Sequence, residues 1–100
     1  MPAVSRKGDS LTTGHICAST TTLAEPGQST VFANGILIAR ITDPTVAHPF
    51  PPSPTCANHT STVKQGSGTV NIAGRKCARV GDAADAGSMT SGSGNVNAGG

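Results

Sequence analysis

The residues best suited to chemistry are imidazoles and a thiol placed around a proline-rich stretch. Residues 42–60 read TDPTVAHPFPPSPTCANHT and contain His48, Cys56 and His59, while His15 stands in the earlier segment SLTTGHIC. Nitrogen and sulfur are the ligands that zinc prefers, and a closed shell of protein ligands is typical of a structural site. The sequence therefore predicts one structural zinc ion held by His15, His48, Cys56 and His59.

Two other cysteines compete for the role of the thiolate ligand. Cys17 lies two residues after His15, a step too short for both side chains to reach one ion comfortably. Cys77 falls within a predicted strand, at a position that an apolar residue holds elsewhere in the chain, which favours a small buried side chain. Cys56 is the preferred ligand, and Cys17 and Cys77 remain alternatives.

A Cys56–His59 nucleophile pair is a further possibility, because an activated thiol needs a nearby base. No third orienting group or oxyanion loop can be argued from the sequence. Asp9, Asp43 and Asp82 recur at one place in a repeat, which suits turn capping better than acid–base chemistry. We therefore expect a protein that is not an enzyme.

The amino-acid composition suggests that a metal or another cross-link is needed to stabilise the fold. The 100 residues suit a single domain spanning 1–100, yet Trp and Tyr are absent and Phe32 and Phe50 are the only phenylalanines. Small scaffolds with so little bulky apolar mass usually depend on a disulfide or a metal. The sparse charge and the frequent β-branched residues disfavour full disorder.

Net charge and the N-terminal segment narrow the functional classes. A charge of +2 with almost no aromatic residues argues against a nucleic-acid partner. The first residues, MPAVSRK, lead into no apolar segment of the kind that a signal peptide needs. We expect a protein made in the cytoplasm, where reduced thiols and metal sites are commoner than disulfides.

An internal repeat organises the chain. Residues 27–43, GQSTVFANGILIARITD, align without gaps with residues 66–82, GSGTVNIAGRKCARVGD. Fragments of the same unit stand at the two ends, SRKGD at 5–9 and GSGNVNAGG at 92–100. Repetition at fixed spacing indicates a repeat architecture. Joining the end fragments gives a third unit, so three units could close around an axis and bring their connecting loops together.

Each unit is predicted to form a β-hairpin. Strands over 30–33 and 36–41 flank Asn34-Gly35, the dipeptide that best suits a type I′ turn with positive φ at both positions. Ala73-Gly74 takes this place in the second unit as a weaker turn pair. Since no segment has a sustained helical period, we expect an all-β fold with little or no helix.

These motifs resemble the PAAR-repeat family, the sharpened tips of contractile injection machines. The motif recurs as SRKGD, LIARITD and CARVGD, and GSGTVNIAG and STVFANG are similar to the family's Gly-Ser-x-x-Val-x-x-x-Gly segments. The resemblance extends from Pro2 to Gly100. It implies a small cone of β-hairpins with pseudo-threefold symmetry and, near the vertex, a zinc ion held by three histidines and a cysteine. The ligand set proposed above matches that shell in type and order.

Two positions depart from the family pattern. Thr42 replaces the usual glycine in the second copy, which leaves the backbone of that turn open. The connecting segment after Asp82, AADAGSMTSGS, is predicted to supply no ligand, so that the other two connections carry all four.

The resemblance also implies a partner. The broad base of the cone would cap a trimeric β-helical spike, one chain per trimer, in a type VI secretion system or a phage tail, and the tip would pierce the envelope of a target cell. Assembly into the machine and delivery outside the cell would follow synthesis. The chain starts and stops at the repeat, so no effector domain is expected. An alternative is a free-standing zinc-binding adaptor. The residues predicted to contact the spike are small apolar side chains around the hairpins: Val31, Ile36, Val70 and Val96.

Overall fold

The computed structural model describes residues 2–51 and 54–99, and these residues form an all-β fold, as predicted. The described residues contain no helix, and none therefore that could cross a membrane. Their strands are β1 (Ser10–Thr12), β2 (Thr20–Thr22), β3 (Phe32–Ala33), β4 (Ile36–Leu37), β5 (His48–Pro49), β6 (Asn58–His59), β7 (Asn71–Ile72), β8 (Arg75–Lys76), β9 (Ala83–Ala84) and β10 (Gly87–Ser88).

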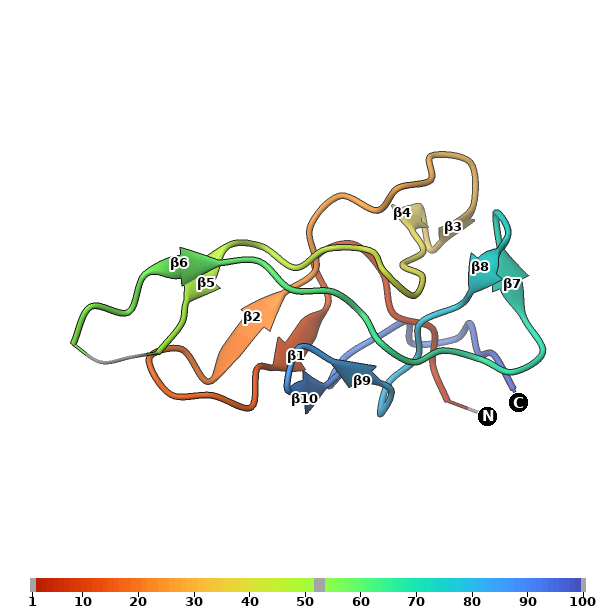
Figure 1. Ribbon diagram of the computed structural model, residues 1–100. Helices are drawn as coiled ribbons and strands as arrows, with labels where there is room; N and C mark the ends of the chain where they lie inside the picture. The colour runs from red at the N-terminus through yellow and green to blue at the C-terminus, as the bar shows by residue number, and fades with distance from the viewer. Residues whose placement is uncertain (1, 52–53, 100) are drawn as a thin grey trace.

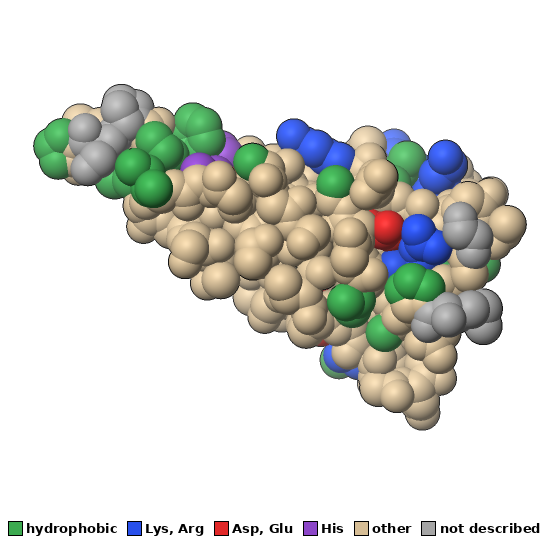
Figure 2. All heavy atoms as spheres, turned by 90° about the horizontal axis from the view of Figure 1, so that it is seen from below, with side chains coloured by type: hydrophobic (Ala, Val, Ile, Leu, Met, Phe, Trp, Pro, Cys, Tyr) green, Lys and Arg blue, Asp and Glu red, His purple; other side chains and the backbone are tan. Residues whose placement is uncertain are grey.

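Each strand pairs with its neighbour in sequence as an antiparallel hairpin. The β3–β4 and β7–β8 hairpins lie at one end of the molecule with both chain termini, and β5–β6 extends toward the other end (Figure 1). The molecule measures 40 × 23 × 21 Å and tapers between these ends (Figure 2). We call the end with β3–β4, β7–β8 and the termini the base, and the end toward which β5–β6 extends the narrow end.

The two chain ends meet to form the third base unit. Ala3 bridges Asn97 in antiparallel fashion. The amide of Val4 donates to the carbonyl oxygen of Val96 at 3.0 Å, and that of Ala98 donates to Pro2 at 3.0 Å. The N- and C-terminal fragments of the repeat therefore combine, as the sequence predicts.

A closed ring of backbone hydrogen bonds joins the three units. The amide of Ser5 donates to the carbonyl oxygen of Ala78 at 2.9 Å, Ala39 donates to Ser5 at 3.0 Å, and Ala78 donates to Ala39 at 3.0 Å. Each residue precedes the arginine of its own repeat copy. One chain thus reproduces the contact pattern of a symmetric trimer, which is the predicted pseudo-threefold symmetry.

The core follows the same symmetry. The backbone amides of Leu23, Val63 and Met89 each donate a hydrogen bond to the carbonyl oxygen of the aspartate of a repeat unit, and each of the three residues is at most 2 % exposed. A second apolar cluster lies toward the base, with Val4, Ile38 and Cys77 among its buried members. The predicted spike contacts Val31, Val70 and Val96 pack against this second cluster while partly exposed, and Ile36 is 37 % exposed.

The hairpin turns confirm the prediction made from Asn34-Gly35. Asn34 and Gly35 have φ values of 55° and 75°, and Ala73 and Gly74 have 49° and 86°. Positive φ at both central positions is what a type I′ turn requires, and it matches the right-handed twist of the paired strands.

Thr42 adopts a left-handed backbone, with φ at 70°, and its equivalents Gly8 and Gly81 have φ values of 84° and 91°. A left-handed conformation costs a side chain with a Cβ roughly 1–2 kcal/mol. The Thr42 hydroxyl also accepts a hydrogen bond from Arg75, but both side chains are exposed. Thr42 is therefore a strained residue at a position where the other two units have glycine.

Replacing Thr42 with glycine should raise the free energy of unfolding by about 0.5–1 kcal/mol, since relief of the strain exceeds the added entropy of the unfolded chain. Urea denaturation would measure the change. The reverse substitution Gly81→Thr is the matched control, because a Cβ at Gly81 meets no atom within 4 Å and only the backbone is affected. It should destabilise, and a stabilising Gly81→Thr would contradict the explanation.

Candidate metal centre

Three hairpins carry a cluster of ligand atoms toward the narrow end. His15 comes from the connection between β1 and β2, and His48 and His59 face each other as register partners in β5 and β6. Asp85 comes from the turn between β9 and β10, where its φ is 54°. The symmetry of the fold thus brings one connection from each unit to a common place.

The four ligand atoms lie within 4.8 Å of one another. Nε2 of His48 is 2.8 Å from Oδ2 of Asp85 and 2.8 Å from Nε2 of His59. Nε2 of His15 is 3.1 Å from Oδ2 of Asp85 and 3.2 Å from Nε2 of His59. Ligand atoms about 2.0 Å from a tetrahedral ion stand about 3.3 Å apart. These four separations are close to that value, so small shifts of the side chains would place all four atoms around a single small cation.

Backbone carbonyls fix which nitrogen of two imidazoles faces the centre. Nδ1 of His15 lies 3.2 Å from the carbonyl oxygen of Ile16, and Nδ1 of His48 lies 2.8 Å from that of Val46. A carbonyl oxygen can only accept, so each Nδ1 carries a proton and Nε2 is the nitrogen that faces the centre. A metal ion at the centre would bind the Nε2 atoms of the three imidazoles and one carboxylate oxygen at once.

Burial and an aromatic cover strengthen the electrostatics of the cluster. The side chains of His48, Asp85 and His15 are 4 %, 6 % and 9 % exposed. Phe50 packs against two of the imidazoles, with ring centroids 4.9 Å from His15 and 4.1 Å from His59. Burial raises the pKa of Asp85, but hydrogen bonds with His48 and His15 outweigh it and leave that pKa below its ordinary value. The carboxylate is therefore available as an anionic ligand.

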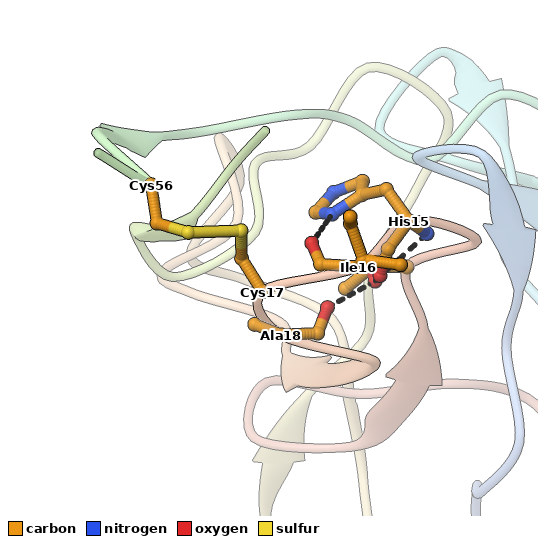
Figure 3. Close-up of a disulfide and its surroundings, with 6 residues drawn as sticks. His15, Ile16, Cys17, Ala18 and Cys56 are labelled. Carbon is orange, nitrogen blue, oxygen red and sulfur yellow. Dashed lines mark hydrogen bonds between the residues drawn. A yellow bond between two sulfur atoms is a disulfide. The ribbon is translucent and has the colours of Figure 1, made fainter. Parts of the chain in front are cut away.

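The structure brings together the three predicted histidines but not the predicted thiolate. Cys56 forms a disulfide with Cys17, with Cα atoms 6.0 Å apart, beside the loop that carries His15 (Figure 3). Because its sulfur is bonded to another sulfur, Cys56 is neither a thiolate ligand nor a free nucleophile for His59 in this form. The sequence also led us to expect reduced thiols, whereas Cys17 and Cys56 are oxidised to a disulfide in this structure.

Asp85 is the residue that the sequence reasoning missed. The connection after Asp82 is predicted to supply no ligand, but the structure places its Asp85 among the three histidines. A usable signal was present in the sequence, because Asp85 is the one acidic residue in the connecting segment 83–93. A metal ion held by this cluster would therefore have nitrogen and oxygen ligands in place of nitrogen and sulfur.

Cys77 is the free cysteine among the described residues, and it is fully buried, as predicted for a small apolar side chain. Burial raises the pKa of the Cys77 thiol to about 11, with smaller effects of Arg79 and Asp82 in opposite directions. Since the thiolate is the reactive form, this thiol should be inert at neutral pH.

Alkylation of the folded, unreduced protein with iodoacetamide should therefore modify no cysteine. After unfolding without a reductant, mass spectrometry should find Cys77 alone modified, and after unfolding and reduction Cys17 and Cys56 as well. Modification of Cys17 or Cys56 in the unreduced protein would show that the disulfide is absent.

No family model matches the chain, and no curated protein sequence matches it.

Proposed function

We propose that this protein is the tip of a trimeric spike in a contractile injection machine, as its resemblance to the PAAR-repeat family implies. The observation that carries the proposal is the closed ring of hydrogen bonds from Ser5 to Ala78, Ala78 to Ala39 and Ala39 to Ser5. A single chain with this pseudo-threefold symmetry can present similar contacts to all three chains of a trimer. Strand ends of a β-helical spike would otherwise remain unpaired.

The base offers apolar groups in threefold positions for such a contact. Side-chain acceptors hold the three equivalent loops in the same way: Gln28 accepts from the amide of Val31, Ser67 from that of Val70, and Ser93 from that of Val96, each at 2.9 Å. The three valines are partly exposed. With Ile36, they are the residues that we propose contact the spike.

The narrow end has the composition expected of a part that enters an envelope. Segments 10–24 and 44–63 contain no Asp, Glu, Lys or Arg. Ile16, Val46 and Phe50 are 67 %, 45 % and 41 % exposed. Basic side chains gather over the broad part, away from this end (Figure 2). We propose a mechanical role without catalysis, with synthesis in the cytoplasm followed by assembly into a phage tail or a type VI secretion apparatus.

We further propose that the cation is one structural zinc ion. His15, His48, His59 and Asp85 would hold it, and all four ligand types are ones that zinc accepts. The ion would supply a cross-link between the three hairpins of the narrow end, and four protein ligands leave no position for a reacting water. The chain's own residues orient the imidazoles through the carbonyl oxygens of Ile16 and Val46 and shield them with Phe50.

The test of capping is to mix the protein with a trimeric spike fragment and measure the mass of the complex by light scattering. One chain per trimer is expected. The variant Val70→Asp should abolish the complex, and Val46→Asp, an exposed position of the narrow end, should leave it intact. A folded protein that fails to join any spike trimer would favour the adaptor function instead.

A further inference from the structure

We propose that Cys17 and Cys56 form a thiol–disulfide exchange site whose oxidation locks the metal ion into the centre. The proposal rests on the metal centre described above. It assigns a role to the cysteine pair that the ligand set does not use.

The disulfide joins the same two segments that supply the three histidines. Cys17 follows His15 in the connection between β1 and β2, and Cys56 precedes His59 in the connection between β5 and β6. Release of the ion requires His15 to separate from the imidazoles of the β5–β6 hairpin. With the disulfide closed, a detached His15 stays close to the ion, and its high local concentration favours rebinding.

Backbone geometry at both cysteines indicates that reduction would loosen the two loops. Cys17 has φ at 80° and Cys56 has φ at 41°, and a left-handed conformation is unfavourable for a cysteine. Such a conformation persists only where the surroundings impose it. The covalent bond is the constraint that these two residues share, so its removal lets both loops relax beside the ligands.

Both cysteines of the pair lie at the surface of the protein, where a small thiol or disulfide can approach. Cys17 is exposed and Cys56 is half-buried, whereas Cys77 is fully buried and cannot compete for the partner. A small disulfide such as oxidised glutathione serves as the oxidant. One cysteine thiolate attacks it and releases one glutathione thiol, and the second cysteine then displaces the other, so that two thiols are oxidised and one disulfide is reduced. The cytoplasmic thiol pool drives the reverse reaction.

This chemistry gives the tip two states. The reduced protein made in the cytoplasm would load and exchange its ion readily. On exposure to oxidising surroundings the pair would close, and the ion would be retained while the tip works outside the cell.

The experiment measures the rate at which excess chelator removes zinc from the full-length, zinc-loaded protein. Oxidised protein is compared with protein reduced by a phosphine, which adds no competing thiol. We expect removal to be roughly 10- to 100-fold slower from the oxidised form. The variant Cys17→Ser/Cys56→Ser should lose zinc at the reduced rate with or without the phosphine, and Cys77→Ser should respond as the wild type does.

Equal rates from oxidised and reduced wild-type protein would overturn the lock and leave the metal centre standing. Slower loss from the reduced form, with a sulfur-to-metal charge-transfer band after replacement of zinc by cobalt, would also overturn it, since a freed thiolate would then be a ligand. Failure of every form to bind zinc at one ion per chain would overturn the centre itself and the lock with it.

Discussion

Replacing His48 with alanine should lower the midpoint of thermal unfolding of the zinc-loaded protein by roughly 15–30 °C. Ligand present at about 1,000 times its dissociation constant stabilises by about 4 kcal/mol, and each kcal/mol shifts the midpoint of a domain of this size by about 4–8 °C. His48 is the most buried of the three imidazoles and contacts both Asp85 and His59. Its loss removes one ligand and leaves the Asp85 carboxylate without its closest partner.

Calorimetry of loaded and metal-free samples separates metal binding from packing. The large difference between variant and wild type should appear in the loaded samples and shrink when the ion is removed from both. Thr20→Ala, an exposed change in the neighbouring β2, is the control and should melt with the wild type. A wild-type protein that melts at the same temperature with and without zinc would count against the centre.

The parts of the fold that could be predicted from sequence are those with a local signal. Asn34-Gly35 specifies its turn because both residues tolerate positive φ. The repeat fixed the alignment of β3–β4 with β7–β8, and the end fragments correctly indicated a unit closed by the two termini. Turn capping by Asp9, Asp43 and Asp82 is confirmed too, since each accepts a hydrogen bond from the amide of the arginine three residues earlier.

The fourth member of the candidate metal centre could not be predicted in the same way, because it depends on how far each hairpin extends from the base. The β9–β10 hairpin is short and ends in a turn, so Asp85 reaches the histidines from that turn. The longer connections carry Cys17 and Cys56 beyond the cluster, where the two sulfurs meet each other. Residue spacing predicts neither how far a hairpin extends from the base nor which cysteines pair. The odd number of cysteines also argued against a disulfide.

The three arginine–aspartate pairs occupy equivalent places but differ in burial. Side chains of the Arg40–Asp43 pair are 6 % and 4 % exposed, against 16 % and 10 % for Arg6–Asp9. Asp43 also accepts a hydrogen bond from the amide of Gly27 at 2.9 Å. The same chemical change made in two units therefore compares a more buried ion pair with a less buried one.

Asp43→Ala should lower the free energy of unfolding by about 3–5 kcal/mol, because it leaves the buried guanidinium of Arg40 without its anion. Asp9→Ala should cost clearly less, since water can reach Arg6 and solvate it. Urea denaturation of the zinc-loaded proteins measures both values. The double variant Arg40→Met/Asp43→Ala should recover part of the loss, because the unpaired charge is then gone. If Asp9→Ala were as costly as Asp43→Ala, the aspartates would act through the turn hydrogen bonds that they share, and burial of the ion pair would not decide their contribution.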